Sequence, residues 1–317
     1  MLKKLRQRVL ISIVLAGAVY LAFTIYANFT QVLQAFGQFN WLLLPLLLLL
    51  SFMNYFARFL KWDYYLSIVH VEMKKVDSLS TFMSGLIMSV TPAKLGEVLK
   101  SVLVKEITGV PISKTAPIIL AERITDFLSL LIIAITGAFF FDYGGRITII
   151  VAVFIILLIL AISNKKIALP IINFAEKIPF IKKYIHNIHS AYESSYQLLK
   201  PKPLIQMTLF SLIAWGFECF GYYIILINFN VNFGILWAFF SYSFSTIIGA
   251  ISMLPGGLGL TEGSLTFLLV EKHVSTDIAV ATTFIIRVVT LWFAVLVGIV
   301  SLTIYQKRYG KIKMESL

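Results

Sequence analysis

Ionisable residues stand inside the apolar stretches of this 317-residue sequence, where charged side chains bind ligands or carry protons. They are Glu97, Glu122, Arg123, Asp126, Glu218, Glu262 and Arg287. An isolated charge near the centre of a lipid bilayer costs roughly 2.5 to 3.5 kcal/mol or more, so such groups should face the bundle interior and pair. As a set they indicate a pathway for a polar substrate or for protons. For any single residue, a salt bridge that only holds helices together is the alternative.

The composition places these charges in a membrane protein. Hydrophobic residues make up 59% of the chain and charged residues 13%, and the mean hydropathy is +0.90. A soluble globular domain of this length would not have that balance, so we expect an all-α polytopic membrane protein. The net charge of +12 fits basic cytoplasmic loops, and no nucleic acid is expected as a partner. A single cysteine and scattered histidines predict neither a disulfide nor a metal or other cofactor.

Hydrophobic runs divide the chain into spans and interrupted regions. Runs long enough to cross a bilayer lie at about 9–29, 41–60, 116–141, 147–163, 204–228 and 276–306. Two further apolar regions, 79–106 and 233–271, are broken near their middle by proline and glycine. The prediction is one transmembrane domain over 1–317 with six transmembrane helices and two re-entrant helical hairpins. Eight full spans is the alternative, in which both interrupted regions cross.

Lysine and arginine set the orientation of the predicted spans. They gather at the N-terminus, in 58–75, in 164–202 and in the C-terminal tail, which are therefore expected to be cytoplasmic. This predicts a multi-pass protein of the plasma membrane with both the N- and C-termini in the cytoplasm. The segment 164–203 is predicted to be a cytoplasmic amphipathic connection on the inner leaflet.

An internal repeat links the two interrupted regions. Both contain Pro-x-x-Leu-Gly followed by glutamate, at Pro92 to Glu97 and at Pro255 to Glu262. An arginine follows each glutamate after a similar number of residues, Arg123 in the first case and Arg287 in the second. The predicted units are 41–141 with hairpin 79–106, and 204–306 with hairpin 233–271, in opposite orientations. Inverted repeats with broken helices indicate the binding site of a secondary transporter.

The proline and glycines of the second motif have a conformational use. Gly256, Gly257 and Gly259 permit a tight turn with backbone close to a ligand, and Pro255 can open the turn without losing a donor. The helix that follows would aim its free N–H groups at an anion such as phosphate. An ordinary external loop is the alternative. Arg58, with Lys61 and Trp62, ends the second span either as an interfacial anchor or as a headgroup contact.

Taken in order, these motifs resemble the lysylphosphatidylglycerol synthase transmembrane family, a flippase-like group. The matching residues are Arg58 and Trp62, Pro92 to Glu97, Glu122, Arg123 and Asp126, Pro255 to Glu262, and Arg287 and Trp292. The resemblance implies movement of an aminoacylated phospholipid between leaflets. Some members carry a soluble synthase domain, and none is expected in this chain, which ends soon after its last span. Lys94 stands where the family often has arginine, which loses the bidentate grip on phosphate.

The leading hypothesis is a flippase that moves an aminoacylated or phosphate-linked lipid, with Arg123 and Arg287 neutralising the phosphate. Glu97, Asp126 and Glu262 would accept a cationic headgroup or carry protons. No catalytic residue is assigned. The alternatives are a membrane enzyme acting on a lipid phosphate and a scaffold for a glycosyltransferase.

The expected partners are a phospholipid or polyprenyl-linked lipid, a separate lipid synthase or glycosyltransferase, and a second copy of the chain. The residues expected to bind or transport the substrate are Arg58, Pro92, Lys94, Gly96, Glu97, Glu122, Arg123, Asp126, Pro255, Gly256, Gly257, Gly259, Glu262 and Arg287.

Overall fold

The computed structural model describes residues 14, 17–25, 27–91, 97–141, 149–150, 153, 157 and 185–310. Within these residues every regular element is a helix, which confirms the all-α class. The first half contains α2 (Phe29–Gln38), η1 (Trp41–Leu43), α3 (Leu44–Ile68), α4 (Lys75–Gly85), η2 (Leu86–Val90), α5 (Leu99–Thr108) and α6 (Ile112–Phe141). The second contains α10 (Ile185–Leu198), α11 (Pro201–Asn228), α12 (Ile235–Ile251), η4 (Pro255–Gly257), α13 (Leu260–Glu271), α14 (Thr276–Arg287), η5 (Val288–Trp292) and α15 (Phe293–Tyr309).

Three helical stretches in the described part are long and apolar enough to cross a membrane. They are Trp41–Ile68, Pro201–Asn228 and Thr276–Tyr309, the last running through the π-helical turn η5. These correspond to three of the predicted spans. With 30 residues, α6 would reach about 45 Å at 1.5 Å per residue. Three of its charged residues lie close together in the sequence. The predicted spans 9–29 and 147–163 lie partly outside the described residues, so the number of crossings stays a prediction.

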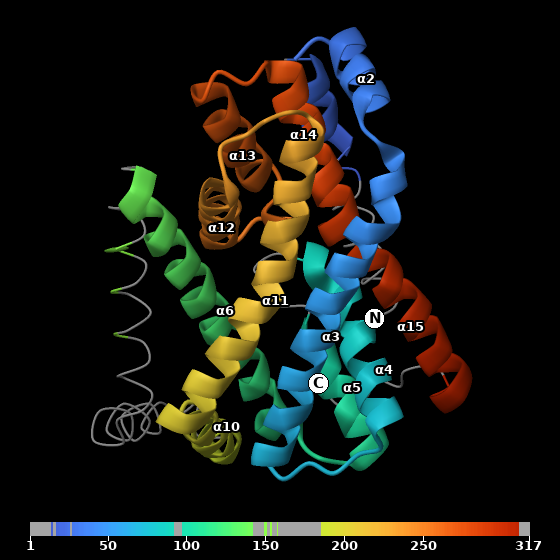
Figure 1. The fold of residues 1–317 in the computed structure, drawn as a ribbon. Helices are drawn as coiled ribbons and strands as arrows, with labels where there is room; N and C mark the ends of the chain where they lie inside the picture. Colours follow the sequence, from blue (N-terminus) through green and yellow to red (C-terminus); the bar gives the residue numbers. More distant parts are fainter. Residues whose placement is uncertain are drawn as a thin grey trace.

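Two helical hairpins lie at opposite ends of the molecule (Figure 1). We call α4 to α5 the first hairpin and α12 to α13 the second. The segments that join their helices are called elbows: 91–98, of which 92–96 lie outside the described residues, and 252–259. The first hairpin occupies the lower end in Figure 1 and the second the upper end, while α3 and α11 pack side by side between them. Their helices begin and end within a few residues of the predicted regions 79–106 and 233–271.

Each hairpin packs on the last long helix of the other half. The first hairpin lies against α15 through α4 and η2, and the second lies against α6 through α12. Glycines allow this close approach: Gly298 on α15 faces the backbone of Ile87, and Gly137 on α6 faces Phe240. A Cβ at either glycine would overlap its neighbour. The two halves are therefore interlocked by packing that does not tolerate larger side chains.

Local structure recurs 160 residues apart in the two central helices. Both α3 and α11 end in the same turn, with the N–H of Val71 donating to Leu66 O and that of Val231 donating to Leu226 O, each at 2.9 Å. His70 and Asn230 hold a positive φ there, 51° and 58°. The pattern of buried and exposed positions is the same over 61–79 and 221–239. These matches support the repeat, although the proposed unit boundaries stay a prediction.

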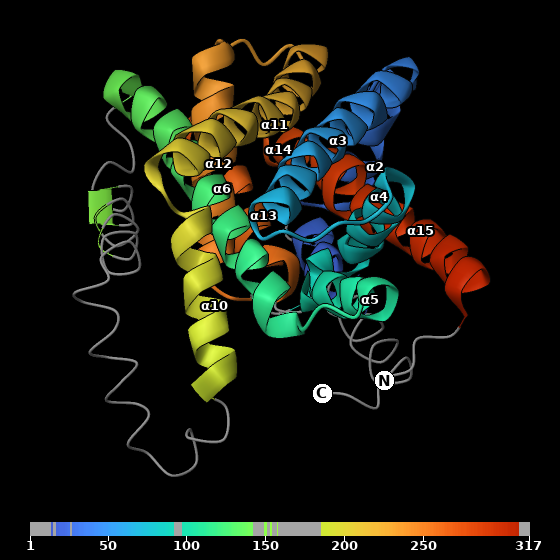
Figure 2. The same cartoon turned by 90° about the horizontal axis from the view of Figure 1, so that it is seen from below.

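The helix before α11 packs against the protein as well as showing a polar face. α10 lies along α6, as seen from below in Figure 2. Ser194, Ser195, Leu198 and Leu199 at its end are buried. This is the described part of the predicted amphipathic connection 164–203, whose first half, 164–184, lies outside the described residues.

Candidate functional site

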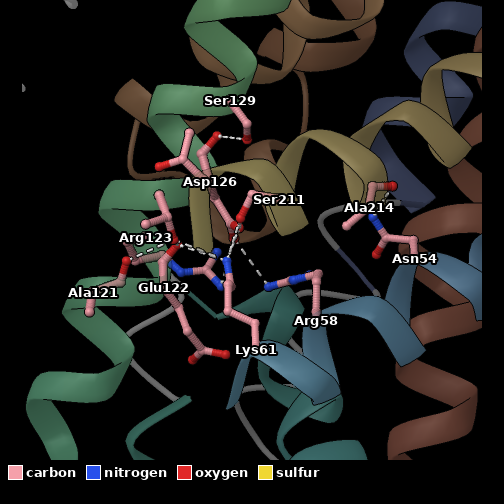
Figure 3. Close-up of polar contacts among 12 residues, drawn as sticks. Asn54, Arg58, Lys61, Ala121, Glu122, Arg123, Asp126, Ser129, Ser211 and Ala214 are labelled. Carbon is pink, nitrogen blue, oxygen red and sulfur yellow. Dashed lines mark hydrogen bonds and ion pairs between the residues drawn. The ribbon is translucent and has the colours of Figure 1, made fainter. Parts of the chain in front are cut away.

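The buried charges of the first half form one connected set around Asp126 of α6 (Figure 3). Arg58 and Lys61 reach Asp126 from α3, and Arg123 reaches it from one turn earlier on α6. The Lys61 ammonium lies 2.6 Å from Asp126 Oδ1, and the two arginines lie 3.5 and 3.4 Å from Oδ2. Ser211 of α11 also donates to Asp126, at 3.0 Å. Asp126 therefore joins helices from both halves of the molecule.

Lys61 is enclosed by the groups to which it donates. Its side chain is 1% exposed, and its ammonium contacts Ser211 Oγ at 2.6 Å and Thr125 Oγ1 at 3.1 Å in addition to Asp126. The predicted span ended at residue 60 because the apolar run stops there, yet α3 continues to Ile68 with Lys61 inside the bundle. Lys61 and Trp62 are both buried and contact protein.

The first elbow returns to the same charges through Glu97 and Lys100. Glu97 Oε2 accepts from Arg123 at 3.1 Å, and Lys100 lies 2.5 Å from Glu122 Oε2. The Lys100 ammonium also lies 4.7 Å from the ring centre of Trp62, a cation–π contact. We call this set the first network, and its members are Arg58, Lys61, Glu97, Lys100, Glu122, Arg123 and Asp126. It holds four cations and three carboxylates.

The second elbow makes a smaller and tighter pairing. Arg287 Nε donates to Glu262 Oε1 at 2.6 Å, and Arg287 Nη2 donates to the carbonyl of Gly256 at 2.5 Å. Glu262 Oε2 accepts from the N–H of Gly259 at 2.7 Å, so the protein itself uses the start of α13. Gly256, Gly257 and Gly259 have φ values of 61°, 69° and 87°, which explains the glycines. The elbow is thus held by the arginine that the repeat pairs with it.

A helix near the N-terminus covers the second elbow. Tyr20 accepts a hydrogen bond from Trp292 Nε1 at 2.8 Å, and its ring contacts that of Phe284 in a tilted arrangement, with 4.7 Å between ring centres. Gly263 of α13 faces Phe23 across van der Waals distance. The second elbow is therefore shielded on this side by side chains from the first helix.

One cavity of about 90 Å³ lies between the two halves. Arg58 lines it from α3, and Glu218 lines it from α11. Gly256 and Gly257 line it from the second elbow, and Arg287 lines it from the end of α14. The remaining lining residues are Tyr55, Ser89, Trp215, Tyr242, Thr246, Gly249, Ala250, Thr261, Thr290, Leu291 and Ala294. This cavity brings an arginine of the first network next to the second elbow.

The structure places most of the predicted site residues in two clusters. Glu97, Glu122, Arg123 and Asp126 meet in the first network with Arg58, while Glu262 and Arg287 meet at the second elbow. Arg58, and not Arg123, shares the cavity lining with Arg287. Pro92, Lys94 and Gly96 lie outside the described residues.

Sequence reasoning missed Lys100 and Tyr242, and it left Lys61 out of the expected substrate-binding set. The spacing of Arg58 to Lys61 and of Glu97 to Lys100 is three residues, the separation of neighbours on a helix face, and could have indicated the two lysines. Nothing in the sequence distinguishes Tyr242 from the other aromatic residues of its apolar run. Within the residues that the structure describes, no group of three histidine, cysteine or acidic side chains could hold a metal ion.

Comparison with known proteins identifies the family. The chain matches the lysylphosphatidylglycerol synthase TM region over residues 9–298. It is 29% identical over 234 residues to a UPF0104 membrane protein of Methanocaldococcus jannaschii, covering 70% of this chain and 95% of that protein. A UPF0104 membrane protein of Methanothermobacter thermautotrophicus is 21% identical over 304 residues, 90% of each chain. One of Pyrococcus horikoshii is 21% identical over 266 residues, 75% of this chain and 79% of that protein. Because the family match spans most of the sequence, this chain is a membrane protein of the lysylphosphatidylglycerol synthase TM region family.

Proposed function

We propose that the protein is a transporter that moves a phosphate-bearing polar lipid between the leaflets of the plasma membrane. The observation that carries this proposal is the cavity lined from both halves by Arg58 and Arg287 beside the broken second elbow. Charged side chains inside a membrane bundle mark substrate pathways, and sites in repeat transporters lie where the repeats meet. The two hairpins act as re-entrant elements from opposite faces.

The lining suits a phosphate group. Arg58 is 7% exposed, and its Nε has no hydrogen-bond partner, so the guanidinium retains a donor that a phosphate oxygen can use. The planar guanidinium matches phosphate with two parallel donors. Thr246, Thr261 and Thr290 line the same space, and the hydroxyls of Thr246 and Thr290 donate to carbonyls of their own helices. The cavity thus offers an arginine from each half to one anion.

The cavity is small in this structure. About 90 Å³ corresponds to about three water molecules, whereas pockets for drug-sized ligands span roughly 300 to 1,000 Å³. A phosphate group is of the first size, and a whole lipid headgroup is not. The proposal therefore includes movement of one half against the other, which opens the site to each leaflet in turn.

The proposal also covers what surrounds the transport step. The cargo is an aminoacylated phospholipid or a polyprenyl-phosphate lipid, supplied by a separate synthase or consumed by a glycosyltransferase. With both termini cytoplasmic, the first hairpin enters from the cytoplasmic face and the second from the outer face. The chain itself catalyses no bond-breaking step.

The test is transbilayer movement of fluorescent lipids in proteoliposomes, read with a membrane-impermeant quencher. Wild type is compared with Arg58→Ala and Arg287→Ala, and Arg308→Ala serves as a control outside the cavity. We expect movement of an anionic phospholipid that falls at least tenfold in both cavity variants and is unchanged in the control.

One result would count against transport, and another would count against the cavity as the site of transport. If folded wild-type protein moves no anionic, zwitterionic or aminoacylated lipid, the proposal fails, and hydrolysis of a lipid phosphate becomes the next activity to measure. If movement persists in both cavity variants, lipid crosses elsewhere, and the cavity is not the site. Circular dichroism and gel filtration of each variant show whether the fold is retained.

A further inference from the structure

Glu218 is the one carboxylate lining the cavity within the described part of the chain. It is 7% exposed, and its Oε2 accepts a hydrogen bond from the hydroxyl of Tyr242 at 2.7 Å. Glu218 stands on α11 160 residues after Arg58 on α3, the separation at which the two helices repeat their local structure. Equivalent positions of the two halves therefore present opposite charges to the same small space.

The ionisable groups that share the cavity lining with Glu218 come from three helices. Tyr55 and Arg58 project from α3, Tyr242 from α12, and Arg287 from the end of α14. The Tyr55 hydroxyl donates to Thr290 O at 2.6 Å, so its proton is directed away from Glu218. Cys219, next to Glu218 on α11, is turned toward Ser243 at 3.6 Å. Two arginines and one carboxylate are thus the charged groups of the described lining.

Among the described residues, the charges of the first network, the second elbow and the cavity balance only when Glu218 is ionised. The first network has one more cation than carboxylates, and the second elbow adds the pair of Arg287 and Glu262. Glu218 supplies the carboxylate that brings these described residues to five of each sign. A phosphodiester entering the cavity would leave an uncompensated negative charge, which a low-dielectric interior strongly disfavours.

We propose that Glu218 takes up one proton from water as an anionic headgroup enters the cavity, so that lipid and proton cross together. This inference rests on the proposed transport function. The carboxylate becomes a neutral carboxylic acid, no bond of the lipid forms or breaks, and the proton leaves to water when the headgroup leaves. The bound state then carries the same net charge as the empty one.

Protonation also removes a competitor for Arg58. A neutral carboxyl group no longer competes with the phosphate for Arg58, and its O–H can itself donate to a phosphate oxygen. Tyr242 can continue to donate to the carbonyl oxygen of the acid. The same residues can therefore bind a proton together with the anion, and they bind no proton when the anion is absent.

The first test measures coupling in proteoliposomes that contain fluorescent phosphatidylglycerol. With one proton per lipid, a pH difference of one unit should drive the labelled lipid toward the alkaline side, up to about a tenfold ratio between leaflets. A potassium diffusion potential should have no effect, because an anion and a proton together are neutral. The distribution is read by the fraction of label that an impermeant quencher reaches.

Glu218→Gln is the decisive variant, because glutamine keeps the size and one acceptor of glutamate but takes up no proton. It should still move lipid, but a pH difference should no longer create asymmetry. Movement should now respond to membrane potential, since the lipid charge crosses alone. Glu271→Gln, an exposed position at the end of α13, is the matched control and should behave as wild type.

A second test needs no transport. Infrared difference spectra of the protein in nanodiscs, with and without phosphatidylglycerol, should show a carboxylic acid C=O band that appears with anionic lipid. The band should be absent in Glu218→Gln and present in Glu271→Gln.

The outcomes separate the two proposals. Lipid movement that ignores the pH difference, is driven by potential in wild type and gives no C=O band overturns proton coupling and leaves the transporter standing. A complete absence of lipid movement overturns the transporter, and the coupling proposal with it. If Glu218→Gln retains both the asymmetry and the band, another group carries the proton, and the assignment to Glu218 is wrong.

Discussion

Each elbow has an equivalent glutamate–arginine ion pair, but the residues around the two pairs differ. Glu97 pairs with Arg123 at 3.1 Å in the first half, and Glu262 pairs with Arg287 at 2.6 Å in the second. Each glutamate follows the Pro-x-x-Leu-Gly motif, and each arginine comes from the helix after the hairpin. This pair therefore belongs to the repeated architecture, and in each half it connects the elbow region to the helix after the hairpin.

The surroundings show which charges belong to one half alone. Three residues after the glutamate the first half has Lys100, whereas the second has Leu265. Three residues after the arginine, Asp126 in the first half corresponds to Thr290 in the second. The residue before the arginine is Glu122 in the first half and isoleucine in the second. The first elbow is thus embedded in a network, and the second stands on a single pair beside the cavity.

The difference indicates a division of labour between rigid and mobile parts. The first network joins α3, α5, α6 and α11 through buried charges that share partners, so moving one residue disturbs several contacts. The second elbow depends on Arg287, which contacts both Glu262 and the Gly256 carbonyl. We infer that the first half is the frame and that the second elbow is the part that moves.

The largest effect is expected for Arg287→Ala. It leaves Glu262, which is 0% exposed, without its cation, and breaking a buried pair in this way costs about 3 to 5 kcal/mol. Lipid movement should be lost as well, since the cavity loses one of its two arginines. Denaturant unfolding in detergent and the quencher assay measure the two effects.

A double variant separates stability from function at this elbow. Glu262→Gln combined with Arg287→Ala removes the stranded charge while glutamine still accepts from the Gly259 N–H. It should recover most of the unfolding free energy but none of the lipid movement. Recovery of transport in the double variant would show that Arg287 serves the fold alone.

Lys61→Met should have an intermediate effect. Asp126 would keep Arg58 and Arg123 at 3.5 and 3.4 Å, so its charge stays compensated. In Arg287→Ala, by contrast, Glu262 loses its cation. Loss of the donated hydrogen bonds should lower the unfolding free energy by about 1 to 3 kcal/mol. Lys75→Met is the control, because that side chain is 78% exposed and its pairing with Asp63 should be worth under about 1 kcal/mol. A loss at Lys61 as large as at Arg287 would contradict the shared-partner account.

Much of this arrangement could be predicted from residue types and spacing. The hairpins followed from proline and glycine within apolar runs, and the expectation that the buried charges pair followed from their place in those runs, although the partners were not predicted. Both depend on local rules of helix breaking and on the cost of an unpaired charge in lipid. The same rules predicted that Asp126 would face the interior, where the structure places it.

What could not be predicted depends on contacts between distant segments. Lys61 follows directly on the predicted end of a span, and only the packing of α6 and α11 against α3 makes its position an interior one. Hydropathy counts a lysine as a boundary whatever surrounds it. The choice of Arg58 over Arg123 for the cavity likewise rests on which faces of α3 and α11 meet.

Replacing part of the first network by its counterparts in the second half tests the comparison directly. Lys100→Leu with Glu122→Ile substitutes an apolar pair for a buried ion pair, a change that is often neutral or stabilising by 1 to 4 kcal/mol. We expect the double variant to lie within about 1 kcal/mol of wild type and each single variant to be clearly less stable. A double-mutant cycle of unfolding free energies measures this. Additive losses would mean that the first half requires these charges for more than mutual pairing.

The smallest effect is expected where the first hairpin meets the end of α15. Arg308 pairs with Asp77 of α4 at 3.1 Å, but its side chain is 49% exposed. Exposed pairs of this kind contribute about 0 to 1 kcal/mol, because water and salt screen the attraction. Arg308→Ala should therefore lower the unfolding free energy by less than about 1 kcal/mol, and the difference should shrink at high salt.

The packing of α4 and η2 along α15 through Gly298 would remain in Arg308→Ala. Gly298→Val is the contrasting variant, since a larger side chain there meets the Ile87 backbone and should weaken the frame far more than loss of the ion pair. If Arg308→Ala were the more damaging of the two, charge and not close packing would hold the first hairpin in place.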